Sequence, residues 1–125
     1  MISSKPEEYR TKFYRDPKAG NEPVRIYVDD LPDKEKAKAL KYINFLREHK
    51  GYLDEPYSKH IIGKIRELRV DFAHNKNRIF YFIFINKNII LLHEFLKKTN
   101  KTPKKEIKRA EENYKQVINN PKIYE

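Results

Sequence analysis

The strongest constraint on the fold is a run of β-branched and aromatic residues at positions 78–85, RIFYFIFI. Such residues favour a strand, and a strand that is apolar on both faces must be covered on both faces. Apolar and charged residues alternate over residues 65–72, and residues 89–96 form a third apolar stretch. Turn residues at 74–77 and 86–88 separate these segments, so we predict an antiparallel meander with the second strand at its centre.

Residues 31–50 are predicted to form a helix. Pro32 suits the first turn of this helix, and Gly51 follows it as a C-terminal stop. The predicted buried stripe recurs at a three-residue step and consists of Ala37, Leu40, Ile43 and Leu46.

Residues 24–30 fit two structures. The alternation of Val24, Ile26 and Val28 is that of a strand, whereas Pro23 suits the first turn of a helix. Both possibilities stay open on this pattern alone.

The final helix is expected after Thr102 and Pro103, with Thr102 as its N-cap and Pro103 at its first helical position. Its predicted buried face consists of Ile107, Ala110, Tyr114, Val117 and Ile118.

The remaining segments complete the expected order of elements. A short first strand is expected at residues 11–15, an irregular stretch at 52–63, and a flexible end at 1–10. The order is then strand, one or two helices, three strands and a helix. We therefore predict one α+β domain over residues 1–125, a small antiparallel sheet packed by N-terminal helices and a C-terminal helix.

The charge of the chain indicates a polyanionic partner. Its 125 residues include 28 Lys and Arg against 18 Asp and Glu, a formal net charge of +10. Such an excess attracts nucleic acid, although the same charge also fits a protein that only needs solubility. No apolar run is long enough to span a bilayer and residues 1–14 lack the apolar stretch of a signal peptide, so we expect a cytoplasmic protein without membrane contact.

Several kinds of site are disfavoured by composition. The chain has no cysteine, so neither a disulfide nor a cysteine-based zinc site is expected. Three glycines cannot build a Gly-rich phosphate loop, and no cluster has the spacing of metal ligands. We expect neither a metal nor a small-molecule cofactor.

The segment 97–109 is rich in basic residues and contains one acid. Ammonium groups beside free N–H donors at a helix start suit a phosphate, although a solvated basic cap has the same composition. The basic residues are Lys97, Lys98, Lys101, Lys104, Lys105, Lys108 and Arg109.

Two arginines and a histidine stand out in the predicted meander. Arg69 and Arg78 lie on apolar strands, and the guanidinium group is a planar fork for a phosphodiester. A structural pair of Arg69 with Glu67 or Asp71 explains the position equally well. His93 lies in an apolar strand, where a histidine is more often half-buried than catalytic, although it is a common general acid or base.

The motifs together resemble a known family. IRELR at 65–69, Arg78 with Tyr81, and LLHEFLKKTNKTPKKEIKRAEE at 91–112 resemble the phage-derived, HigB-like branch of the RelE/ParE toxin superfamily, which supplies the toxins of type II toxin-antitoxin systems. The most specific string is FLKKTNKTP at 95–103. The segment PVRIYVDDLP at 23–32 also resembles that branch, in which it is helical. The resemblance extends over residues 12–118.

The resemblance implies a βααβββα domain that enters the ribosomal decoding site and cuts messenger RNA, so that translation is inhibited. In this metal-independent endoribonuclease reaction the ribose 2′-OH attacks the adjacent phosphate, and basic side chains stabilise the charge that develops. The general base is left open among His93, Tyr81 and Glu67. The catalytic positions carried over are Glu67, Arg69, Arg78, His93, Lys97 and Lys98, and those expected to bind RNA or the ribosome are Lys101, Lys104, Lys105, Lys108 and Arg109.

The resemblance also implies partners. They are the ribosome with its messenger RNA and a cognate antitoxin, a helix-turn-helix DNA-binding protein of the HigA-like kind, through which alone operator DNA would be contacted. Two other functions remain open. One is a ParE-like gyrase poison, and the other is a nucleic-acid-binding domain without catalysis.

Overall fold

The apolar run predicted to be a central strand lies at the centre of a five-stranded sheet. The computed structural model describes residues 8–85 and 87–125. The elements are β1 (Arg10–Phe13), α1 (Pro23–Asp29), α2 (Asp33–Glu48), β2 (Ser58–Ile62), β3 (Ile65–Phe72), β4 (Asn75–Phe84), β5 (Asn88–Lys97), α3 (Lys104–Asn119) and the 3₁₀ helix η1 (Pro121–Tyr124).

The strand order is β1-β5-β4-β3-β2, and every neighbouring pair is antiparallel except β1 with β5. β1 pairs only with the first part of β5, from Asn88 to Leu91. The second part of β5 therefore runs beyond β1 along the edge of the sheet, where both candidate sites described below are found.

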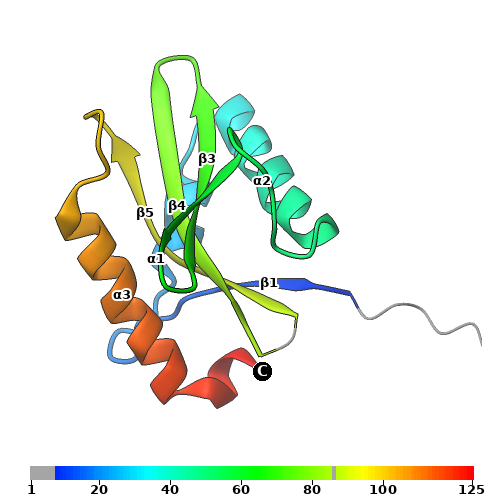
Figure 1. Cartoon of the computed structure of the whole chain (residues 1–125), viewed down its shortest axis with the longest axis vertical. Helices are drawn as coiled ribbons and strands as arrows, with labels where there is room; N and C mark the ends of the chain where they lie inside the picture. Colours follow the sequence, from blue (N-terminus) through cyan, green and yellow to red (C-terminus); the bar gives the residue numbers. More distant parts are fainter. Residues whose placement is uncertain (1–7, 86) are drawn as a thin grey trace, which may run out of the picture.

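Helices cover both faces of the sheet, as Figure 1 shows with α2 on one side and α3 on the other. Alternate residues of β4 feed two separate cores, because successive strand side chains point to opposite faces. Ile79 and Tyr81 pack in the core with α1 and α2, and Phe80 and Phe82 pack in the core with α3. The predicted α+β class is confirmed.

The N-terminal part departs from the predictions at several points. Residues 23–29 form a helix, as the family resemblance favours. Arg10 already belongs to β1, while residues 1–7 of the segment expected to be flexible lie outside the described residues. The stretch 52–63 was expected to be irregular, yet it contains β2, so the implied βααβββα order lacks one strand. β2 was missed because its mostly exposed, polar residues at the sheet edge carry little apolar alternation.

Two turns differ from the prediction as well. The β3–β4 hairpin turns at Ala73 and His74, and Phe72 pairs with Asn75, so Asn75 to Asn77 lie in β4 and not in the turn. Ala73 has a φ of 53°, the left-handed conformation that such a tight turn requires. Phe84 pairs with Asn88, and Asn86 of the predicted second turn lies outside the described residues.

The predicted face of α2 was partly wrong. Its buried residues are Glu35, Ala39, Ile43 and Leu46, whereas Ala37 and Leu40 are exposed. A strict three-residue step drifts around a helix of 3.6 residues per turn, so only its last two positions reach the core.

The start of α3 also differs. The N-cap position is Pro103 and its side chain makes no capping bond, so the predicted cap by Thr102 is wrong. Ala110 and Val117 are buried as predicted and Ile107 and Tyr114 are partly buried, but Ile118 is exposed. Asn113 is buried instead, and its side-chain amide donates to the Leu92 carbonyl of β5 at 2.8 Å.

Candidate functional site

Three of the predicted basic residues, Arg69, Arg78 and Lys97, lie on the face of the sheet that packs against α3. Cross-strand pairing aligns Arg69 of β3 with Arg78 of β4, and Arg78 with Phe95 of β5. Two residues farther along, Lys76 of β4 pairs with Lys97 of β5 and with Asp71 of β3. Directly paired residues project to the same face, so Arg69, Arg78, Lys76 and Lys97 form one group, here called the basic cluster.

Glu67 of β3 contacts both arginines of the basic cluster. Its side chain is fully buried, and it lies 3.2 Å from Arg69 Nε and 3.8 Å from Arg78 Nε. The Thr102 hydroxyl donates to the other carboxylate oxygen at 3.2 Å, which joins the loop before α3 to the sheet. A buried carboxylate is tolerated only when cations and donors compensate it, so Glu67 and the two arginines form one unit.

Arg78 is held more tightly than the sequence indicates. Its side chain is only 6% exposed, and Nη1 contacts Asp71 Oδ1 at 2.6 Å and the Asn77 carbonyl at 3.0 Å. Its Nε is buried without a hydrogen-bond partner among the described residues. The structural pairing considered as the alternative for Arg69 is present, with Glu67 and, at 3.6 Å, with Glu55. The arginines therefore have structural partners and also border the open part of the sheet.

Lys97 lies close enough to the other charges for its ionisation to respond to them. Burial lowers the pKa of Lys97 below its ordinary value, and the negative charge of Glu67 opposes this lowering. The positive charges of Arg78, Arg69 and Lys76 add to the lowering. These cations repel one another, so an anion placed among them would be stabilised.

Lys76 was absent from the sequence prediction. It was assigned to a turn, whereas the two-residue β3–β4 turn places it in β4 opposite Asp71, and the β4–β5 register places it opposite Lys97. A register count from a tight turn at Ala73 and His74 could have found it. Lys98, by contrast, is exposed and lies just beyond the end of β5.

His93 lies apart from the basic cluster. Its Nε2 is 2.8 Å from Glu106 of α3, and its ring lies beside the rings of Phe80 and Phe95. It lines a separate cavity of about 390 Å³ together with Lys105, Glu106 and Arg109, among others. Of the predicted catalytic residues, His93 therefore lies at this cavity, whereas Arg69, Arg78 and Lys97 lie in the basic cluster.

The other candidate base is farther away. Tyr81 points into the core with α1 and α2, where its hydroxyl contacts Ser58 at 2.7 Å and donates to the Gly51 carbonyl at 3.1 Å. Burial raises the pKa of Tyr81 above its ordinary value. Of the three residues considered as general base, Glu67 alone contacts the arginines.

The residues predicted to bind RNA or the ribosome lie in the loop before α3 and in the first turns of α3. Their exposed side chains extend the positive surface from the β5 end along the loop and over α3. They are Lys101, Lys104, Lys105, Lys108 and Arg109.

The described residues contain neither a cluster of metal-ligating side chains nor a membrane-spanning helix. No group of three or more His, Asp or Glu side chains there could hold a metal ion. No helix in the described part of the chain is long and apolar enough to cross a membrane.

Comparison with known proteins gives the chain a family. No curated protein matches the sequence at a significant level. The profile of a family described as phage-derived protein Gp49-like (DUF891) matches residues 27–115. This span runs from α1 into α3 and includes Glu67, all four members of the basic cluster and the FLKKTNKTP string. The chain therefore belongs to the Gp49-like family of phage-derived proteins, within the RelE/ParE-like toxin superfamily.

Proposed function

We propose that this protein is the toxin of a type II toxin-antitoxin system and cuts messenger RNA on the ribosome. The observation that carries the proposal is the basic cluster, four cations on one sheet face, of which Lys76 is exposed, Arg69 and Lys97 are partly exposed and Arg78 is buried. Family membership makes a toxin plausible, and the cluster supports RNA as the target because closely spaced cations suit a phosphodiester.

The proposed reaction needs charge stabilisation at phosphorus. The ribose 2′-oxygen forms a bond to the adjacent phosphorus, its proton passes to a base, and the bond from phosphorus to the 5′-oxygen breaks as that oxygen takes up a proton. Arg69, Arg78 and Lys97 would stabilise the negative charge of the phosphorane. An incoming phosphate competes with the exposed carboxylate of Asp71 for Arg78 Nη1.

Glu67 has a positioning role in this proposal. Its carboxylate holds Arg69 from one side and lies under Arg78, so the two guanidinium groups keep a fixed separation. Fixed donors cost no reorganisation during the reaction, which is the basis of electrostatic catalysis. The base is left open in this proposal, and Glu106 contacts Nε2 of one candidate, His93, at 2.8 Å.

The experiment is primer extension on messenger RNA after induction of single variants. Arg69→Ala and Lys97→Ala should each lower cleavage by about a hundredfold, because each removes a contact to the transition state. Lys64→Ala, an exposed lysine outside the cluster, is the matched control and should cleave like the parent protein. Circular dichroism on each variant separates loss of activity from loss of folding.

Other outcomes would assign another function. Full cleavage by folded Arg69→Ala and Lys97→Ala variants would remove the basic cluster from the site. A halt of DNA synthesis before protein synthesis would favour the gyrase poison, and growth arrest without cleavage would favour a nucleic-acid-binding domain.

We further propose that an antitoxin neutralises this surface. A cationic face that binds RNA is best covered by an acidic partner. Co-expression with the neighbouring gene should yield a stable complex and restore growth. Tolerated expression of the active chain alone would contradict this.

A further inference from the structure

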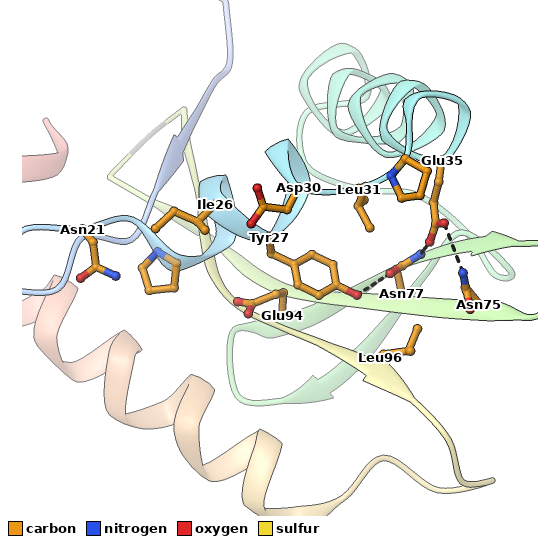
Figure 2. Close-up of a pocket in the computed structure, with 12 residues that line it drawn as sticks. Asn21, Ile26, Tyr27, Asp30, Leu31, Glu35, Asn75, Asn77, Glu94 and Leu96 are labelled. Carbon is orange, nitrogen blue, oxygen red and sulfur yellow. Dashed lines mark hydrogen bonds between the residues drawn. The ribbon is translucent and has the colours of Figure 1, made fainter.

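A second cavity lies on the other face of the sheet, away from the basic cluster. It is an open pocket of about 580 Å³ between α1, the first turn of α2 and the ends of β4 and β5. Figure 2 shows Tyr27 projecting from α1 across this pocket toward Asn77, with Glu94 beneath it. None of the twelve lining residues is a lysine or an arginine, although the chain carries 28 of them.

The charge of the pocket is negative. Its carboxylates come from Asp30, Glu35 and Glu94, on three different segments. Glu35 accepts hydrogen bonds from the side-chain amides of Asn75 at 3.2 Å and Asn77 at 2.7 Å, which leave its charge in place. Within the part of the chain that the structure describes, no lysine or arginine lies within ion-pair distance of these three carboxylates.

One oxygen of the Glu94 carboxyl group lacks a hydrogen-bond donor. This oxygen, Oε2, is buried and has no hydrogen-bond partner among the described residues, and His93 Nδ1 lies 4.0 Å from it. Burial, together with the negative charge of Glu106, raises the pKa of this carboxyl to about 7. A buried oxygen without a donor is uncommon in a folded protein, and a donor supplied from outside would satisfy it.

The rim of the pocket is apolar. Ile26 is 48% exposed and Leu96 is 39% exposed, and they stand on α1 and β5 respectively. Leu31 lies between Asp30 and α2 on the same wall. An exposed apolar rim around polar acceptors is typical of a protein-binding surface, in which one polar side chain fixes the partner and apolar side chains flank it.

We propose that this pocket binds an arginine side chain of a partner protein, with apolar neighbours of that arginine packed on Ile26 and Leu96. The guanidinium group carries several N–H donors and an obligatory positive charge, which match an unpartnered carboxylate oxygen beside further carboxylates. The Tyr27 hydroxyl donates to Asn77, so its oxygen can still accept a hydrogen bond from the same ligand. RNA is excluded by repulsion, and this inference does not rest on RNA cleavage.

The test uses the full-length protein labelled with ¹⁵N and three tripeptides, acetyl-Leu-X-Leu-amide with X as arginine, citrulline or lysine. Citrulline keeps the shape of arginine without its charge. The arginine peptide should shift the resonances of Tyr27, Asn77 and Glu94, and the citrulline peptide should bind about tenfold more weakly. Glu94→Gln should lower the affinity for the arginine peptide by about fivefold or more. Glu48→Gln on the exposed end of α2 should leave that affinity unchanged.

Four outcomes would overturn the proposal. Equal binding of the arginine and citrulline peptides would make the pocket an apolar groove without charge selection. Stronger binding of spermidine than of the arginine peptide would assign it to a soluble polyamine. Resonance shifts confined to residues outside the pocket, or full affinity in folded Glu94→Gln and Asp30→Asn variants, would remove the site.

Discussion

The two faces of the sheet differ in charge and in how that charge is compensated. Asn77 and Arg78 are neighbours in β4, yet Asn77 lies in the acidic pocket and Arg78 in the basic cluster. The same holds in β5, where Glu94 faces the pocket and Lys97 faces the cluster. A strand alternates the direction of its side chains, so one short sequence can serve two surfaces of opposite sign.

The two surfaces also differ in their internal partners. In the cluster, Arg69 pairs with Glu67 and Arg78 pairs with Asp71, so a ligand must compete with protein carboxylates. In the pocket, Glu35 accepts hydrogen bonds from two side-chain amides, and Glu94 Oε2 has no hydrogen-bond donor among the described residues, with His93 Nδ1 at 4.0 Å. The comparison teaches that the charges of the basic face are compensated by opposite charges within the fold, whereas those of the acidic face are compensated by few groups of the described chain.

The largest expected effect is the loss of stability when Arg78 is removed from the basic cluster. Arg78→Ala should lower the free energy of unfolding by about 3–5 kcal/mol, because it removes a buried cation above the buried Glu67. Urea denaturation provides the measurement, with the exposed Arg109→Ala as control.

A double variant separates charge from packing. Adding Glu67→Gln to Arg78→Ala should restore part of the lost stability, because no unpaired charge then remains buried. A loss below about 1 kcal/mol in Arg78→Ala would show that Arg69 and Lys97 compensate Glu67 without Arg78.

The contribution of Glu94 to folding stability should change with pH in the opposite sense to that of a carboxylate in an ordinary ion pair. Burial raises the pKa of Glu94 from 4.5 to about 7, with Glu106 of α3 adding repulsion and Tyr27 and His93 beside it. At low pH the group is protonated in both folded and unfolded chains. As pH rises from 4.5 to 7 the unfolded chain ionises first, so Glu94 lowers stability progressively and fully above pH 7.

Glu94→Gln removes this penalty. The variant should gain on the order of 2–3 kcal/mol over the parent protein at pH 8 and less than about 1 kcal/mol at pH 5. Urea unfolding at the two pH values measures it, and Glu112→Gln on the exposed side of α3 is the control. An equal gain at both pH values would contradict the assignment to ionisation of Glu94.

The smallest effect concerns the loop that joins the basic cluster to α3. Thr102→Val removes the hydroxyl that donates to Glu67 while keeping the side-chain shape, and should cost about 1 kcal/mol. Thr99→Val, whose hydroxyl contacts only the exposed Lys101 carbonyl in the described structure, should cost less than half as much. If both variants were equally stable, the contact of Thr102 with Glu67 would contribute nothing.

Much of the sheet could be read from local patterns. β3 was predicted with its observed bounds, and the central place of β4 followed from its apolar residues on both faces. The α2 face was only partly predicted, since a stripe counted at three residues per turn leaves the true helical period. β2 was missed because an exposed edge strand can be polar on most positions.

The candidate site could be predicted only in part. Arg69, Arg78 and Lys97 were named, and the register brings them together with Lys76. His93 was named with them, but its contact with Glu106 depends on where α3 packs and removes it from the cluster. The acidic pocket was not predicted at all, because Glu94 lies far along the sequence from Asp30 and Glu35.

The sequence by itself determined which residues form the strands and which motifs mark the family, because strand propensity and side-chain alternation act over a few neighbours. Only the tertiary structure decided which charges meet. The registers of β4 with its two neighbours align Lys76 with Asp71 and with Lys97, and the packing of α1 and α2 against the sheet brings Asp30 and Glu35 into one pocket with Glu94. Electrostatic interactions depend on distance and burial in space, and neither quantity is encoded in the local pattern of a chain.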